Sequence, residues 1–421
     1  MRKNIAAIIF LCIIILCMFL SISGLIVKQV SDKLMPPDIN SKINWEELYP
    51  FESEDAVIPV KNTAEKRSLY SYIRQKLEDY TSEYILGYSF IVGEAKKYEY
   101  IIGWNIAPVF SYNGVVKLQD GHLTAFTVSK DLTGNAEAVI DFAGYCRDKG
   151  IDFFYLNIPS KICIYEDIDL SGTFDFANQN ADRFLNLLGE AGVKYYDFRK
   201  TLHDEGIKHH ESFYRTDHHW KPKMGLWAAK HILEYLRNDY GLKAEPEILD
   251  SNKFEYVDYP EWFLGSYGKK ITLAWTAPDE FTMIYPKFKT LLEYEVPDKD
   301  VNTSGDFRII YDMKPVEEKD YYGKNPYGAY DHGDCALKKI NNCLIQNGKR
   351  LLIIHDSFGN SVVPFLALGI NEVEEIDLRH FTGSLKKYIE ADKPDIIVVM
   401  YASTSISDSG NAGKTALCYF R

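Results

Sequence analysis

The 421-residue chain lacks a cysteine framework and an excess of positive charge. Its seven cysteines include no CxxC pair, and no HExxH zinc motif is present, which argues against a metal scaffold. We expect sparse buried thiols, with one Cys335–Cys343 bridge as the alternative. Acidic residues outnumber basic ones by 60 to 48, a net charge of −12, so no nucleic-acid partner is expected.

The composition is that of a globular protein. Hydrophobic residues make up 46% and charged residues 26% of the chain, which excludes wholesale disorder and a collagen-like fibre. No internal repeat is present, and the length suits one large domain or two modest ones. The aromatic share of 14% is a bias that carbohydrate-facing surfaces share, although it does not decide the function.

One long apolar run begins close to the N-terminus. Residues 5–27 contain no charge, with Arg2 and Lys3 before them and Lys28 after them, and a helix of that length spans a bilayer. A cleaved signal peptide is the alternative, but its Ala-x-Ala-like site is missing. We therefore expect residues 1–30 to be a single-pass anchor in the cell membrane. The positive-inside tendency places its N-terminus in the cytoplasm and the rest of the chain outside.

Beyond the anchor, we predict a linker and juxtamembrane helical region over 31–100 and a catalytic domain over 101–421. A turn at 119–121 between two apolar runs predicts a hairpin. Helices are then expected over 137–149, before Gly192, over 222–240 and after Ser357, and strands over 151–158, 193–198, 350–354, 373–376 and 395–401. This alternation predicts an α/β fold with a mostly parallel sheet covered on both faces. The Tyr- and acid-rich stretch 243–345 reads as an insertion, which could form a lobe over the site.

The segment Arg215–Trp220 (RTDHHW) stands just before the helix that begins near Pro222. An acid two residues before a histidine can hold one ring nitrogen and leave the other free, so Asp217 can orient His219 as a general base. The alternative is structural, since Thr216 or Asp217 could cap the coming helix.

A second segment, LLIIHDSFGNS, joins an apolar strand to a polar turn that contains Ser357. The carboxyl ends of strands line the site in open α/β sheets, and a serine there can act as a nucleophile beside free helix N–H groups. A capping serine is the alternative. Together, Asp217, His219 and Ser357 make a candidate Ser-His-Asp triad in the chain order Asp, His, Ser.

Other polar residues follow the strands. Tyr401, Ser403 and Thr404 could reach the same rim, with packing as the alternative for the tyrosine, and Arg379 could bind an anion or pair with Asp377. A denser group of nitrogen and oxygen donors offers a metal site as a minority reading; it comprises His209, His210, Asp217, His218 and His219. Because these spacings match no fixed zinc pattern, we predict no metal and no cofactor.

The string TDHHW, with HDSFGNS far downstream, resembles the DHHW protein family, which is similar to the alginate O-acetyltransferases AlgJ and AlgX of the SGNH-hydrolase-like superfamily. Further family-like stretches lie between residues 112 and 406; they include YNGVVKLQDGHLT, GIDFFYLNIPSKICIY, YYDFRKTL, WFLGSYGKK, IDLRHF and DIIVVMY. The resemblance leaves the anchor and much of the insertion unmatched.

The resemblance implies an SGNH-like three-layer α/β/α sandwich in which the Asp-x-His element precedes the serine. Its motifs place the triad on Asp217, His219 and Ser357. Two positions depart from the pattern: His355 stands where ordinary SGNH enzymes have the glycine of Gly-Asp-Ser, and His218 stands where AlgJ and AlgX usually have another residue. His218 would then serve packing or substrate contact.

The predicted oxyanion donors belong to the serine turn. The backbone N–H of Ser357 or Phe358 and the side chain of Asn360 are the candidates.

The activity that the resemblance implies is transfer of an acetyl group to a surface or secreted polysaccharide through an acyl-serine. A membrane-bound O-acyltransferase partner would supply the acetyl groups. Two alternatives stay open. With water as the acceptor, the same residues would make a carbohydrate acetyl esterase, and a non-catalytic polysaccharide-binding or assembly protein could share the fold.

Overall fold

The computed structural model describes residues 110–112, 114–118, 121–165, 175–406, 410 and 415–421. All of them belong to one compact unit, Lys97–Arg421. The predicted anchor, residues 1–30, and the region 31–100 lie outside the described residues. Within the described part of the chain, no helix combines the length and the apolar character needed to cross a membrane.

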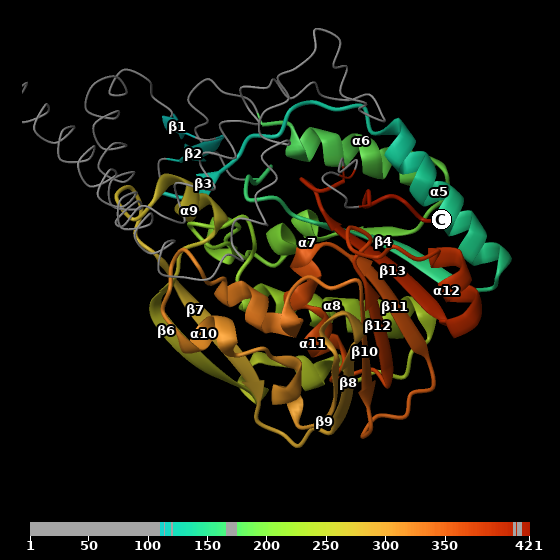
Figure 1. Ribbon diagram of the computed structural model, residues 1–421. Helices are drawn as coiled ribbons and strands as arrows, with labels where there is room; N and C mark the ends of the chain where they lie inside the picture. The colour runs from blue at the N-terminus through green and yellow to red at the C-terminus, as the bar shows by residue number, and fades with distance from the viewer. Residues whose placement is uncertain (1–109, 113, 119–120, 166–174, 407–409, 411–414) are drawn as a thin grey trace, which may run out of the picture. The chain divides into compact units, whose positions relative to one another are not determined.

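Strands and helices alternate through most of this unit (Figure 1). The strands are β1 (Phe110–Tyr112), β2 (Val115–Lys117), β3 (Leu123–Thr124), β4 (Asp152–Ile158), β5 (Tyr195–Asp197), β6 (Phe254–Phe263), β7 (Asp279–Pro286), β8 (Leu292–Val296), β9 (Val301–Gly305), β10 (Leu337–Asn342), β11 (Arg350–His355), β12 (Glu372–Ile376) and β13 (Ile396–Ala402). The α-helices are α5 (Thr133–Asp148), α6 (Ala177–Glu190), α7 (Phe198–Asp204), α8 (Pro222–Tyr240), α9 (Ser266–Ile271), α10 (Lys314–Glu317), α11 (Val363–Leu366) and α12 (Leu385–Asp392).

An eight-stranded sheet lies at the centre, in the order β5-β4-β13-β11-β12-β10-β8-β9. The first five strands pair in parallel, as predicted, whereas β10, β8 and β9 continue the sheet in antiparallel pairing. These last three strands belong to the predicted insertion, 243–345. The sheet is therefore mixed, and the insertion widens it as well as adding the separate β6–β7 ribbon.

Helices cover both faces of the sheet, which gives the predicted three layers (Figure 1). One core joins α8 and α11 to one face and the other joins α5, α6 and α12 to the opposite face. Side chains alternate accordingly along β11: Leu351 and Ile353 enter the first core, and Leu352 and Ile354 enter the second. Because both faces are buried, the parallel strands read as continuous apolar runs.

Several local predictions can be compared with the structure. The hairpin is present as the antiparallel β2–β3 pair, and α8 has the predicted bounds. A helix follows Ser357, as predicted, but its first part is a 3₁₀ helix (Ser357–Ser361) and its α-helical part is the short α11. Pro364, within the first turn of α11, has no N–H to close an α-helical bond to the carbonyl of residue 360. The alternative disulfide is absent, because Cys335 and Cys343 are both free.

Candidate active site

The loop before α8 and the turn after β11 meet at the carboxyl end of the parallel strands, where open α/β sheets place their sites. Phe213 and Trp220 form an antiparallel bridge that closes the loop. The Trp220 indole N–H then donates to the Ser361 hydroxyl over 2.9 Å. This bond ties the loop that carries Asp217 and His219 to the turn that carries Ser357.

His219 bridges the other two predicted triad residues. Its Nδ1 lies 2.6 Å from Asp217 Oδ1 and its Nε2 lies 2.7 Å from Ser357 Oγ. An ionised carboxylate can only accept, so Nδ1 carries the hydrogen and Nε2 is left to accept the Ser357 proton. The His219 ring stacks on Tyr327, with 4.1 Å between the ring centroids. Sequence reasoning missed Tyr327, which lies in the insertion.

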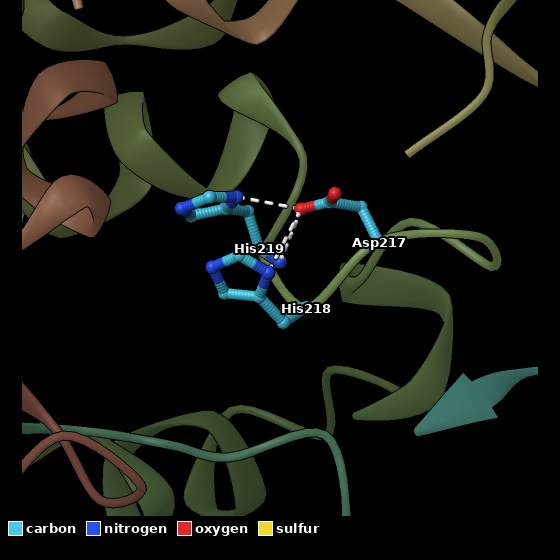
Figure 2. Close-up of side chains that lie close together, drawn as sticks. All are labelled: Asp217, His218 and His219. Atoms are coloured by element: carbon cyan, nitrogen blue, oxygen red, sulfur yellow. Dashed lines mark hydrogen bonds and ion pairs between the residues drawn. The ribbon is translucent and has the colours of Figure 1, made fainter. Parts of the chain in front are cut away.

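The Asp217 carboxylate is buried and fixed from several sides. The N–H of His219 donates to Oδ1 over 3.0 Å and the N–H of Ser266 donates to Oδ2 over 2.5 Å. Figure 2 shows the rings of His218 and His219 both turned towards Oδ1. Burial alone would raise the pKa of Asp217, but the two histidines and these hydrogen bonds hold it well below its usual value.

Neither capping alternative describes the structure. The N-cap of α8 is Lys221, with no side-chain cap, so Asp217 is not a helix cap. At the other segment Asp356 caps the 3₁₀ helix: its Oδ1 accepts the Phe358 N–H over 3.0 Å and its Oδ2 accepts the Ala402 N–H over 2.9 Å. The hydroxyl of Ser357 is therefore left to His219.

The oxyanion candidates differ in what already binds them. The Phe358 N–H is engaged by Asp356, and the Asn360 amide donates to Asp334 Oδ1 over 2.8 Å. The Ser357 N–H has no acceptor among the residues that the structure describes. It is the backbone donor of this turn that remains available for a developing negative charge.

Two other predicted site residues are used structurally. Arg379 donates from Nε to both Asp377 oxygens, over 3.0 and 3.1 Å, and from a terminal nitrogen to Asp334 over 3.1 Å. This is the pairing alternative rather than a free anion site. Tyr401 is fully buried on the far face of the sheet and donates to the Leu417 carbonyl over 2.5 Å. It does not reach the rim, because its position in β13 points it into the second core.

A hollow opens beside His218 and Phe358, lined also by Lys161, Tyr267 and Thr404. The His218 side chain is 40% exposed there, and its Nδ1 lies 3.1 Å from the Ser266 hydroxyl. His218 is thus placed where a substrate could touch it.

Lys161 joins the hairpin to the triad loop. Its ammonium donates to the Leu123 carbonyl over 2.6 Å and to the Asp217 carbonyl over 2.5 Å. Sequence reasoning gave Lys161 no role, although its position just after β4 is a signal that could have found it.

The metal alternative retains part of its donor set. One ligand atom from each of Asp217, His218 and His219 lies within 4.8 Å of the others. His209 is used elsewhere, with Nε2 2.6 Å from the Ser160 carbonyl oxygen. An ion in this place would take the Asp217 oxygen that now binds His219, so it would compete with the triad arrangement.

Two family models match the chain. The model described as the SGNH hydrolase-like domain of acetyltransferase AlgX matches residues 121–260. The DHHW protein model matches residues 193–376, a range that holds both the TDHHW loop and the serine turn. The resemblance to the DHHW family is confirmed.

Solved structures of similar fold cover most of the chain. A DHHW family protein from Eubacterium siraeum has 20% identity and a TM-score of 0.56, covering 71% of this chain and 94% of its own. Bacillus cereus PatB1 with a sulfonyl adduct has 19% identity and a TM-score of 0.59, covering 75% of this chain and 100% of its own. Identities this low show the shared fold alone. No curated protein matches the chain.

Proposed function

We propose that this protein is an O-acetyltransferase that acetylates a cell-surface or secreted polysaccharide through an acyl-serine on Ser357. The observation that carries the proposal is His219, which lies within hydrogen-bond distance of both the Asp217 carboxylate and the Ser357 hydroxyl. The match to the acetyltransferase AlgX domain favours acetyl as the transferred group.

The reaction divides into two acyl transfers. His219 Nε2 takes the Ser357 proton while Oγ attacks the acetyl carbonyl, and the resulting oxyanion collapses as the donor's oxygen leaves with that proton. An acceptor hydroxyl then loses its proton to His219 and attacks the acetyl-serine, and Ser357 recovers its proton as the ester forms. Asp217 stabilises the imidazolium in both halves.

The proposed setting is the outer side of the cell membrane, with residues 1–30 as the anchor. A domain held there cannot draw directly on cytoplasmic acetyl-CoA. We therefore include a membrane-bound O-acyltransferase as the partner that delivers acetyl groups, and no cofactor in the domain itself.

The test is acetyl labelling of the intact protein by 4-nitrophenyl acetate, followed by mass spectrometry. We expect one acetyl group on Ser357 in the unaltered protein and in Ser304→Ala, a control at an exposed position of β9, and none on Ser357→Ala. Acetyl labelling of Ser357→Ala equal to that of the unaltered protein would contradict the catalytic proposal and favour a binding or assembly role.

Acceptors separate transferase from esterase. When oligosaccharides are added to the acetylated protein, transfer of the acetyl group to the sugar should be faster than its hydrolysis by water. Rapid release of acetate without a sugar acceptor would favour the esterase, and loss of activity with a chelator would favour the metal alternative at Asp217, His218 and His219.

A further inference from the structure

A second histidine–carboxylate pair lies behind the serine turn. His355, the last residue of β11, and Glu375, on the neighbouring β12, have side chains only 3% and 2% exposed. His355 Nε2 lies 2.6 Å from Glu375 Oε2, and His355 Nδ1 lies 2.6 Å from the carbonyl oxygen of Asp356. Both ring nitrogens of His355 are therefore engaged, and Nδ1 binds the carbonyl oxygen of the residue directly before Ser357.

These two partners fix the protonation of the ring. A backbone carbonyl and an ionised carboxylate can only accept hydrogen bonds, so each nitrogen of His355 must donate one and the ring is an imidazolium. Burial alone would lower the pKa of His355, but the hydrogen bond and the charge of Glu375 outweigh it and raise that pKa.

The rest of the cluster keeps Glu375 ionised. The Lys338 ammonium lies 3.1 Å from Glu375 Oε1 and 2.9 Å from Asp331 Oδ2, and all three side chains are buried. Burial would raise the pKa of Glu375, but Lys338, a hydrogen bond with Asp331 and the contact with His355 hold it well below its usual value. Burial and the charge of Glu375 instead raise the pKa of Asp331. The anionic charge in the cluster thus faces His355.

The carbonyl that accepts from His355 belongs to the peptide whose N–H is that of Ser357. The same carbonyl oxygen also accepts the Gly359 N–H over 2.9 Å. Donation by a cation to a carbonyl polarises the peptide and strengthens its N–H as a donor. The N–H groups of Phe358 and Gly359 are engaged. The N–H that is strengthened, that of Ser357, is therefore also the one that remains available to bind an oxyanion.

We propose that His355 is a positioning residue: as an imidazolium it fixes the Asp356–Ser357 peptide and strengthens the Ser357 N–H as the oxyanion donor. The inference rests on the proposed acyl transfer at Ser357. It gives a role to the residue that stands in place of the glycine of ordinary SGNH enzymes.

The first test separates the charge of His355 from its hydrogen bond. In Glu375→Gln a neutral His355 can still donate from Nδ1 to the Asp356 carbonyl, whereas His355→Leu removes the donor. Removal of an oxyanion donor itself costs roughly 10²–10³ in kcat, and His355→Leu leaves the Ser357 N–H in place but no longer fixed. We therefore expect kcat for 4-nitrophenyl acetate to fall about tenfold in the first variant and at most about 100-fold in the second, with KM unchanged.

His231→Leu is the matched control. His231 on α8 also lies between two carboxylates, 2.9 Å from Glu205 and 2.9 Å from Glu234, but it touches neither segment of the site. Its kcat should equal that of the unaltered protein. Equal kcat values for Glu375→Gln and the unaltered protein would overturn the charge effect, and a change confined to KM would also overturn it.

The second test reads the ionisation of His355 without any reaction. Nitrogen-15 NMR at pH 6 should show both ring nitrogens of His355 protonated in the unaltered protein and one protonated in Glu375→Gln. A neutral ring in the unaltered protein would overturn the inference even if acyl transfer is found. A doubly protonated ring in a protein that forms no acyl-serine would instead overturn the proposed function, and the positioning role with it.

Discussion

The two histidine–carboxylate pairs beside the serine turn use the same chemical groups in different ways. His219 binds Asp217 through Nδ1 and meets the Ser357 hydroxyl through Nε2. His355 binds Glu375 through Nε2 and meets the Asp356 carbonyl through Nδ1. In each pair a carboxylate fixes one ring nitrogen, so the third partner decides what the histidine can do.

The third partners, the Ser357 hydroxyl and the Asp356 carbonyl, differ in whether they carry a proton that they can give away. A hydroxyl can give its proton away, so His219 can pass between a neutral and a charged state while Ser357 reacts. A carbonyl has no proton to give, so His355 stays charged as long as both of its bonds are kept. The Asp217–His219 pair is built to move a proton, and the Glu375–His355 pair is built to hold one.

The sharpest way to break this contrast is to neutralise each carboxylate in turn. Asp217→Asn should lower kcat by on the order of 10⁴, because an amide no longer enforces the tautomer in which Nε2 accepts the serine proton. Glu375→Gln should lower kcat only about tenfold, because His355 can still donate to the Asp356 carbonyl. The comparison requires the rate of acetyl-serine formation in both variants and circular dichroism spectra that match the unaltered protein. Equal losses in the two variants would remove the distinction between the pairs.

Removing the buried cation should affect stability more than activity per folded molecule. Lys338→Met leaves buried carboxylates without their ammonium partner, which costs about 3–5 kcal/mol of unfolding free energy. Lys339→Met is the control on the same strand, because Lys339 pairs with Glu374 while its side chain is 35% exposed, and such pairs contribute about 0–1 kcal/mol. Urea unfolding of both variants measures the difference, and similar losses would contradict the role of the cluster.

Close glycine contacts give a smaller and more local perturbation of each pair. A Cβ at Gly265 would lie 2.2 Å from the Asp217 Cβ, and a Cβ at Gly359 would lie 2.2 Å from His355 Nδ1. Each alanine should cost about 1–3 kcal/mol of stability through overpacking.

The kinetic effects of the two alanines should differ. Gly265→Ala should reduce the acylation rate more, because it moves the carboxylate that orients the base. Gly134→Ala, where a Cβ meets nothing within 4 Å, serves as the control for both. Acylation rates together with melting temperatures test the expected order, and the reverse order would contradict it.

The proton-moving pair could be predicted from the sequence, and the proton-holding pair could not. Asp217 and His219 stand two residues apart in one motif, and Ser357 follows a strand whose continuous apolar run is typical of a buried parallel strand. Lys338 lies in LKKINN, which reads as a charged surface strand. It turns inward because alternation on β10 places it on the same face as Ile340. The carboxylates that make its burial possible come from β12 and from the 3₁₀ helix Pro326–His332.

The contacts between the insertion and the triad could not be predicted from the sequence either. Gly265, Ser266 and Tyr327 contact the triad from segments that lie about 50 to 110 residues beyond TDHHW in the chain. No local spacing links such residues to the motif, because tertiary packing of the start of α9 and of the 3₁₀ helix Pro326–His332 against the loop brings them to it. The helix predicted after Ser357 is present, but its division into a 3₁₀ helix and a short α-helix depends on Pro364, which has no N–H for an α-helical bond to the carbonyl of residue 360.

The smallest expected effect concerns pH. The Asp217–His219 pair should lose its contribution to stability at acid pH, and the Glu375–His355 pair should lose its contribution at alkaline pH. The pKa of Asp217 is held below its unfolded value of 3.8, so its contribution to stability is complete above that pH and is lost as the pH falls towards the folded pKa. The pKa of His355 is raised above 6.5, so its contribution is complete below pH 6.5 and is lost as the pH rises through the folded pKa.

Urea unfolding across pH should therefore show the difference between the unaltered protein and Asp217→Asn shrinking only on the acid side. The difference from His355→Leu should shrink only on the alkaline side, by about 1.4 kcal/mol for each unit that separates the folded and unfolded pKa values. His231→Leu again provides the control for the alkaline series. If the His355 difference stayed constant to pH 9, the pKa of His355 would be the same in the folded and unfolded states, because only a group whose pKa differs between them contributes a pH dependence. That outcome would contradict the raised pKa of His355.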